Sequence, residues 1–255
     1  PTAGESPAAG ERVEGGTLTV QSVEFASLDP HFSSFAQDIS LQRMLWRGLF
    51  TLDIDNVPQP SMAAAEPAVS EDGTTYTVTL REGLLWNDGD DLKAEDFVLG
   101  IHRTCNPVNA GEYQYVLTNI VGCDDHYGAD AFDQALEDAI GVEATDDLTI
   151  EFTLNEPQPT FPIILSLWMT FPAPVHLLPN SSDPWPSGSS APGQMAYNGP
   201  YILTSYSQQD FVELAPNPNW AAPGGVSPTL DNLTIRLIDD LATAPNANRT
   251  GEVSS

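Results

Sequence analysis

Alternating hydrophobic and polar positions predict several strands along the chain. GGTLTVQSVEF begins to alternate at Thr17, and TYTVTLREG places Tyr76, Val78 and Leu80 on one face with threonines on the other. This period of two is typical of half-buried strands. TIEFTLNEP (149–157) alternates in the same way, and TLDIDNVPQP predicts a short strand that runs into a proline turn. GPYILTSYSQQDFVELAPNPNW predicts a hairpin, and LDNLTIRLID predicts a further strand.

Two segments, DISLQRMLWRGLF and AEDFVLGIHRTC, have the spacing of amphipathic helices. Their apolar positions are Ile39, Leu41, Leu45, Trp46 and Leu49 in the first segment and Phe97, Val98 and Ile101 in the second. Strands and helices mix without a strict βαβ rhythm and without an internal repeat. The patterns therefore predict a mixed α/β protein.

Three stretches lie outside these elements. Residues 1–15, PTAGESPAAGERVEG, have the composition of a flexible linker, and the Pro, Ser and Gly residues of 179–193 predict a loop between sections. The apolar run TFPIILSLWMTFPAPVHLLP contains four prolines. Prolines interrupt a helix, so this run indicates buried packing rather than a membrane span.

Charge and cysteine content narrow the class of protein. The 255 residues carry 36 acids against 8 bases, for a net charge of −28, with Lys93 as the single lysine. Nucleic acids and anionic membranes require basic patches, so neither is an expected partner. Cys105 and Cys123 stand 18 positions apart without a CxxC motif. We expect a disulfide and an oxidising compartment, with a pair of buried free thiols as the alternative.

The most unusual stretch, REGLLWNDGDDLKAEDF, crowds six carboxylates around Trp86: Glu82, Asp88, Asp90, Asp91, Glu95 and Asp96. An EF-hand requires its glycine at position six of the loop, and Gly89 comes too early. The economical interpretation is a turn after a strand, followed by acids in the first turn of a helix. A catalytic carboxylate pair is the alternative, although GxSxG, HExxH and phosphate-binding motifs are absent from the sequence. We expect no metal and no cofactor.

Histidines and aromatic residues add weaker indications. The histidines are scattered singly, and Asp124-Asp125-His126 is the acid–histidine neighbourhood that the sequence suggests. Several aromatic residues could line a pocket, although the same spacing fits a core. They are Trp46, Trp86, Trp168, Tyr113, Tyr201 and Tyr206.

Several blocks in one order resemble a known family. GGTLTV…SLDPH, LWRGLFTLD, TYTVTLREGLLWNDGDDLKAEDFVLGIHR, NEPQPTFPIIL, NGPYILTSYSQQDFVELAPNPNW and LDNLTIRLI…RTGEV are similar to segments of the oligopeptide/dipeptide/nickel solute-binding proteins of ABC transporters. The resemblance covers residues 16–253. It implies a non-enzymatic extracellular or periplasmic receptor that captures a peptide or similar small solute and delivers it to an ABC permease. It also implies a lipid anchor upstream of the linker as the contact with the membrane.

The same resemblance implies a domain organisation. The fold would be periplasmic-binding-protein-like, of type II and the peptide-binding subclass, with residues 16–48 and 190–255 as an incomplete first lobe. Residues 49–189 would form an insert domain, and the second lobe would follow residue 255. Gly251-Glu252-Val253 would lead into that lobe.

Ligand contacts are implied on the same grounds. The segment after SLDPH suggests Ser34, Phe35 and Ala36, and the loop after the first strand suggests Phe25 and Ser27. Tyr113 corresponds to a tyrosine of the insert. Ordinary loop packing is the alternative for each of these six residues, Phe25, Ser27, Ser34, Phe35, Ala36 and Tyr113.

Two departures from the family pattern carry expectations of their own. Lys93 stands where the family often has a capping Thr, so we expect Asp91 to cap the helix. Pro245, Asn246 and Asn248 are poor formers of the final helix. Two other functions stay open: an interaction module of the cell surface, and a hydrolase that uses the carboxylates.

Overall fold

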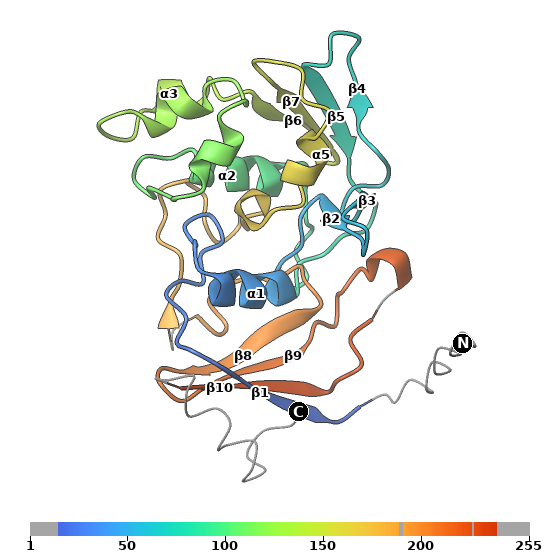
Figure 1. Cartoon of the computed structure of the whole chain (residues 1–255), viewed down its shortest axis with the longest axis vertical. Helices are drawn as coiled ribbons and strands as arrows, with labels where there is room; N and C mark the ends of the chain where they lie inside the picture. The colour runs from blue at the N-terminus through green and yellow to red at the C-terminus, as the bar shows by residue number, and fades with distance from the viewer. Residues whose placement is uncertain (1–14, 189–190, 226, 239–255) are drawn as a thin grey trace, which may run out of the picture.

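The computed structural model describes residues 15–188, 191–225 and 227–238 (Figure 1). Residues 1–14 of the expected linker, the expected final helix with Pro245, Asn246 and Asn248, and residues 251–253 lie outside the described residues. Two four-stranded sheets form the framework, with most helices between or beside them.

The first sheet combines the two ends of the described chain. β1 (Thr17–Ser22), β8 (Tyr201–Ser207), β9 (Phe211–Pro216) and β10 (Asn232–Leu237) lie in the order β1-β10-β9-β8. β1 runs parallel to β10, whereas β8 and β9 form the antiparallel hairpin that the sequence predicted. α1 (Ala36–Leu45) lies over this sheet (Figure 1).

The second sheet is antiparallel throughout. β4 (Ala68–Val69), β5 (Thr75–Thr79), β7 (Thr149–Thr153) and β6 (Val142–Asp146) lie in the order β4-β5-β7-β6. β5 and β7 confirm the predicted alternation, because Tyr76, Val78, Ile150 and Phe152 are buried. The edge strands β4 and β6 had no counterpart in the prediction, since their residues are mostly exposed.

A small hairpin replaces the predicted strand and proline turn. β2 (Phe50–Leu52) pairs with β3 (Pro58–Pro60), so the prolines lie in a strand and not in the turn. The turn is instead built by Asp53, whose Oδ1 accepts from the backbone N–H groups of Asp55 and Val57. Aspartate commonly supplies such local bonds.

Helices are short apart from α1 and α2. α2 (Ala94–Thr104) packs against β6 and β7 with Phe97 and Ile101 fully buried, as predicted. α1 ends at Leu45, earlier than expected, because Trp46 adopts an extended backbone. The remaining helical turns are η1 (Gln114–Leu117), α3 (Cys123–Tyr127), α4 (Gln134–Glu137), α5 (Phe161–Ile164), η2 (Trp168–Thr170) and η4 (Pro223–Gly225).

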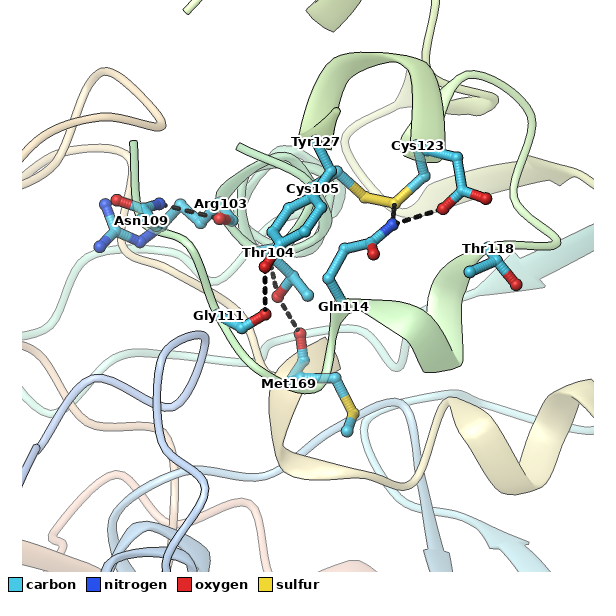
Figure 2. The surroundings of a disulfide bond; sticks show 12 residues. Arg103, Thr104, Cys105, Asn109, Gly111, Gln114, Thr118, Cys123, Tyr127 and Met169 are labelled. Carbon is cyan, nitrogen blue, oxygen red and sulfur yellow. Dashed lines mark hydrogen bonds between the residues drawn. A yellow bond between two sulfur atoms is a disulfide. The ribbon is translucent and has the colours of Figure 1, made fainter. Parts of the chain in front are cut away.

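Cys105 and Cys123 form the predicted disulfide, which ties the end of α2 to the start of α3 (Figure 2). Around it, Gln114 Nε2 donates to Asp124 Oδ1 at 2.8 Å, and Thr104 Oγ1 donates to the Met169 carbonyl at 2.7 Å. The disulfide and these hydrogen bonds together connect α2, α3, η1 and η2.

The acidic stretch around Trp86 is a turn followed by a helix, as predicted. Trp86 N–H donates to the Asp90 carbonyl at 2.9 Å, and Gly89 has φ +100°, a region that favours glycine. The expectation that Asp91 caps α2 is wrong. Lys93 occupies the N-cap position, and its backbone N–H donates to Asp96 Oδ2 at 2.8 Å.

Asp96 also forms hydrogen bonds beyond the start of α2. It is buried, and it accepts from the Trp86 indole at 3.2 Å and from Val175 N–H at 2.9 Å. Burial raises the pKa of Asp96 to about 6, although these hydrogen bonds act in the opposite direction. The carboxylate thus joins the Trp86 turn, α2 and the 173–178 segment.

Most of the aromatic residues considered for a pocket lie in the core. Trp46 and Trp86 are fully buried and pack with Tyr197 and His176 respectively, and Tyr206 is buried against Phe25. For these residues the core interpretation is confirmed. Tyr201 is half-buried in β8, while Trp168 and Tyr113 lie near each other.

Candidate functional site

The loop between β1 and α1 is held by a buried carboxylate. Asp38, in the first turn of α1, accepts from the backbone N–H groups of Ala26 at 3.1 Å and Ser27 at 3.0 Å. Burial raises the pKa of Asp38, and the two backbone bonds oppose that rise. Since Asp38 is 1% exposed, this loop is fixed to the start of α1 from inside the protein.

A second buried network fixes the SLDPH part of the loop to α2. Asp29 Oδ2 lies 2.8 Å from Arg103 Nη2, and Asp29 Oδ1 lies 3.0 Å from His31 Nδ1. His31 Nε2 lies 2.9 Å from the Phe171 carbonyl, which can only accept, so Nε2 carries a hydrogen. The neighbouring pair Asp29 and His31 was missed in the sequence, whereas the ring nitrogens of His126 have no hydrogen-bond partner among the described residues.

Arg103 extends this network to the loop after η2. Its Nη1 donates to the carbonyls of Ser181 at 3.1 Å and Asp183 at 2.7 Å, and its guanidinium lies 5.2 Å from the Trp185 ring. Burial would raise the pKa of Asp29, but the His31 hydrogen bond and the Arg103 charge outweigh it and lower the pKa to about 2. Asp29 is therefore a charged buried anchor at neutral pH.

The segment that follows, residues 32–36, is presented at the surface. Its Ser33 carbonyl accepts from the Trp168 indole N–H at 2.9 Å, which fixes the backbone. Phe32 and Phe35 are nevertheless 48% and 55% exposed. Exposed aromatic side chains on a fixed backbone are a feature of binding surfaces.

Trp168 also contacts the segment that contains Tyr113. The Tyr113 ring lies 4.8 Å from the Trp168 ring in an edge-on contact, and the exposed Tyr115 follows at 5.6 Å from Tyr113. Gly111 packs so tightly that a Cβ would lie 2.2 Å from the His31 carbonyl. We call residues 32–36, Tyr113, Tyr115 and Trp168 the Trp168 platform.

A pocket of about 270 Å³ adjoins this platform through Phe32. Its lining residues come from three separate segments: Ser27, Leu28, Asp29, Phe32, Val108, Asn109, Trp185, Pro186 and Ser187. Four of these nine residues are polar, and polar atoms make up most of the exposed lining, so the pocket is a polar hollow beside the platform.

The structure distributes the predicted ligand residues over three surroundings. Ser34, Phe35, Ala36 and Tyr113 belong to the Trp168 platform, and Ser27 lines the adjoining pocket. Phe25 is 8% exposed and lies edge-on to Tyr206, so its side chain belongs to the hydrophobic core. A ligand role for these residues stays a prediction.

Several residues of this region were not predicted. Phe32 and Tyr115 are exposed aromatics next to predicted contacts, and Trp185 lies in a loop rich in Pro and Ser. An aromatic residue in a polar loop was the signal that could have identified Trp185. Phe35 occupies the N-cap position of α1 and has no side-chain acceptor, so the first backbone N–H groups of α1 are not capped by its side chain.

Potential metal ligands gather elsewhere. Among the described residues, Asp88, Asp90 and His176 form the group whose ligand atoms lie within 4.8 Å of one another. Over all the ranges that the structure describes, no helix is long and apolar enough to cross a membrane.

Solved structures share this fold. The pheromone receptor PrgZ matches 94% of the chain with a TM-score of 0.81 and 26% identity, and the chain covers 46% of that structure. Listeria monocytogenes OppA, solved bound to peptide, matches 96% of the chain with a TM-score of 0.81 and 25% identity, and is also covered to 46%. The protein therefore has the mixed α/β fold of peptide-binding proteins of the OppA type, over roughly half their length.

Sequence relatives agree with this class. The profile described as "Bacterial extracellular solute-binding proteins, family 5 Middle" matches residues 57–255. The chain belongs to this family of solute-binding proteins, which are not enzymes. The expectation of a non-enzymatic protein is thereby confirmed, and the hydrolase alternative is dropped.

Individual relatives differ in their named ligands. The chain is 32% identical over 238 residues to the "Probable deoxycholate-binding periplasmic protein YgiS" of Escherichia coli K12, and covers 41% of it. It is 30% identical over 236 residues to the "Periplasmic oligopeptide-binding protein OppA" of the same strain, and covers 40% of it. The chain thus spans less than half the length of the curated relatives it matches, and these relatives are periplasmic by name.

Proposed function

We propose that this chain supplies the first lobe and the insert of an extracellular receptor that captures a peptide or similar small solute for an ABC importer. Residues 16–48 and 190–255 would form the lobe, 49–189 the insert, and 1–15 the linker. The ligand would be enclosed when a second lobe, following residue 255, closes by hinge motion. The receptor would then deliver it to the permease.

The observation that carries this proposal is the Trp168 platform. The Trp168 indole donates to the carbonyl of Ser33, the residue before Ser34, Phe35 and Ala36, and its ring contacts Tyr113 from a distant part of the chain. The uncapped N–H groups at the start of α1 would donate to ligand carbonyls, and Phe35 and Tyr113 would supply apolar contact. Such backbone bonds favour peptides without specifying their sequence.

The named ligands of relatives are consistent with this class of solute. Listeria monocytogenes OppA is solved with peptide, and the Escherichia coli relative is named for oligopeptides. A further relative is named for deoxycholate, so an apolar non-peptide solute belongs to the same proposal. An upstream lipid anchor would hold the receptor at the membrane, in agreement with the linker composition of residues 1–15.

The test uses the full-length protein purified from its source. Native mass spectrometry would reveal a bound small molecule, and calorimetry would then measure its affinity for wild type, Phe35→Ala and Tyr113→Ala. Ile54→Ala is the matched control, because Ile54 is 95% exposed in the β2–β3 turn. We expect each platform variant to lose about tenfold in affinity, equivalent to about 1.4 kcal/mol, and the control to lose none. Wild-type affinity in both platform variants would contradict the proposed site.

A second candidate function is an interaction module of the cell surface. The exposed apolar side chains Phe32, Phe35, Val108 and Tyr115 favour it, since surfaces of this kind often bind other proteins. Analytical ultracentrifugation of the 255-residue chain distinguishes it from the receptor. Concentration-dependent self-association that Phe35→Ala abolishes would support the module, and a monomer at all concentrations would exclude it.

A further inference from the structure

The metal-ligand group on the Trp86 turn is built from two separate segments. Asp88 and Asp90 lie on the WNDGD turn, and His176 follows the 173–175 segment, 88 positions from Asp88. The imidazole Nε2 of His176 lies 2.9 Å from Asp88 Oδ2 and 3.5 Å from Asp90 Oδ2. All three ligand atoms lie within 4.8 Å of one another.

The two His176 separations lie close to the edges of a metal coordination shell. With metal–nitrogen and metal–oxygen bonds of about 2.0–2.2 Å, neighbouring ligands are about 3.0–3.4 Å apart. A hydrogen bond accounts for the 2.9 Å contact of His176 with Asp88, and the 3.5 Å separation from Asp90 is an ion-pair distance. Two carboxylates that converge on one imidazole, in a chain of net charge −28, form a strongly cation-attracting group.

The backbone that carries the two carboxylates is fixed. Gly89 N–H donates to the Trp86 carbonyl at 3.1 Å, and Asn219 Nδ2 donates to the same carbonyl at 2.8 Å. Asp90 N–H donates to Asp88 Oδ1 at 3.2 Å, which leaves Oδ2 of Asp88 directed to His176. A ligand set held in place in this way loses little conformational entropy on binding an ion.

Asp96 fixes both the segment that carries His176 and the turn that follows Trp86. Asp96 Oδ1 accepts from the backbone N–H of Val175, and Asp96 Oδ2 accepts from the Trp86 indole. The Trp86 ring packs 6.3 Å from the His176 ring. The segments that carry the three ligand atoms are therefore joined by a buried carboxylate beneath them.

We propose that Asp88, Asp90 and His176 form a surface site for one divalent transition-metal ion of the zinc class. Imidazole nitrogen with carboxylate oxygen is a donor set that suits zinc, whereas calcium and magnesium prefer oxygen alone. Three protein ligands leave the remaining positions to water. A bound ion would link the WNDGD turn to the 173–178 segment, a role separate from solute capture and contrary to the sequence-based expectation of no metal.

The test is zinc titration of the untagged full-length protein after removal of metals with a chelator. Calorimetry should show one zinc per chain, and cobalt should quench the fluorescence of the adjacent Trp86. We expect Asp90→Asn and His176→Gln each to weaken zinc affinity by roughly tenfold or more, since even outer-shell losses have effects of this size.

Asp91→Asn is the matched control, because it removes one exposed charge next to the same turn without touching the ligand group. We expect its zinc affinity to stay within about twofold of wild type, as exposed charges on a common surface interact weakly. Absence of zinc binding would overturn the proposal. So would an Asp91→Asn loss equal to that of Asp90→Asn, or calcium binding as tight as zinc that His176→Gln leaves unchanged, since either result assigns the ion to the acidic surface as a whole.

Discussion

Asp29 and Arg103 form a buried ion pair, with 2.8 Å between Oδ2 and Nη2, although they lie 74 positions apart. Arg103 is 1% exposed and also donates to the Ser181 and Asp183 carbonyls. The pair joins the loop before α1 to α2 and to the loop that contains Trp185. The loop before α1 that the pair holds continues directly into residues 32–36 of the Trp168 platform.

Removal of one partner of this pair should be costly. Arg103→Ala leaves the Asp29 carboxylate buried without its cation, and we expect it to lower the free energy of unfolding by about 3–5 kcal/mol. Arg236→Ala is the control, because its pair with Asp210 is about half exposed and should contribute about 0–1 kcal/mol. Urea denaturation at pH 7 measures both values. Equal losses in the two variants would contradict the role of Arg103 as an anchor.

Asp96 should make stability depend on pH. Its pKa is about 6 in the folded protein against an ordinary value of 3.8, so the folded state binds the proton more tightly than the unfolded state. The ionised carboxylate therefore costs stability above pH 6, and this cost is relieved as pH falls from 7 towards 4. Between pH 7 and pH 5 the relief is about 1 kcal/mol.

Other carboxylates also titrate in this range, so Asp96→Asn serves as the reference. The variant should be less stable at every pH, because the amide has one acceptor oxygen for the three N–H groups of Trp86, Lys93 and Val175. Denaturant titrations at pH 7 and pH 5 should show a smaller gain on acidification in the variant than in wild type. Identical gains would show that Asp96 does not titrate in this interval.

The disulfide should stabilise the α2–α3 junction. Cys105 and Cys123 close a loop with a sequence separation of 18, for which chain-entropy arguments give about 3 kcal/mol. We expect the Cys105→Ala/Cys123→Ala variant to lose an amount of this order and to be insensitive to reductant. Wild type should approach the stability of the variant when reduced. A wild-type unfolding curve that reductant leaves unchanged would argue against this contribution.

Gly111 should be intolerant of a side chain. A Cβ there would lie 2.2 Å from the His31 carbonyl, so Gly111→Ala must separate the 108–115 segment from the 31–36 loop. We expect a loss of about 1–3 kcal/mol in unfolding free energy, the usual range for overpacking. Gly128→Ala is the control, since its Cβ would lie 3.1 Å from the Asp124 carbonyl. If Gly111→Ala were as well tolerated as the control, the tight contact would not be required.

Turn and strand chemistry were readable from local sequence. The alternation of Tyr76 and Val78 identified β5, and Gly89 marked the turn after Trp86. Both depend on residues within a few positions of each other, where backbone geometry and side-chain period act directly. The order of blocks along the chain likewise sufficed to recognise the family.

The helix caps and helix ends could be predicted less accurately from the sequence. The cap of α2 was assigned to Asp91, whereas Asp96 accepts from Lys93 N–H while it is buried under Trp86. The sequence predicts that the helix at α1 continues past Leu45, because Trp46 and Leu49 continue the apolar pattern, but α1 ends at Leu45. Both residues are buried, so the pattern reported burial correctly but not the backbone conformation.

The sequence by itself determined the alternating strands β5 and β7, the β8–β9 hairpin, the disulfide partners, the acidic charge and the family, because these follow from local periodicity, composition and the order of motifs. Only the tertiary structure decided which distant residues meet. Trp168 reaches Ser33 across 135 positions, His176 reaches Asp88 across 88, and Arg103 reaches Asp29 across 74. Such contacts depend on how sheets and loops pack in three dimensions, and the period of hydrophobic residues along one segment carries no information about the segment that packs against it.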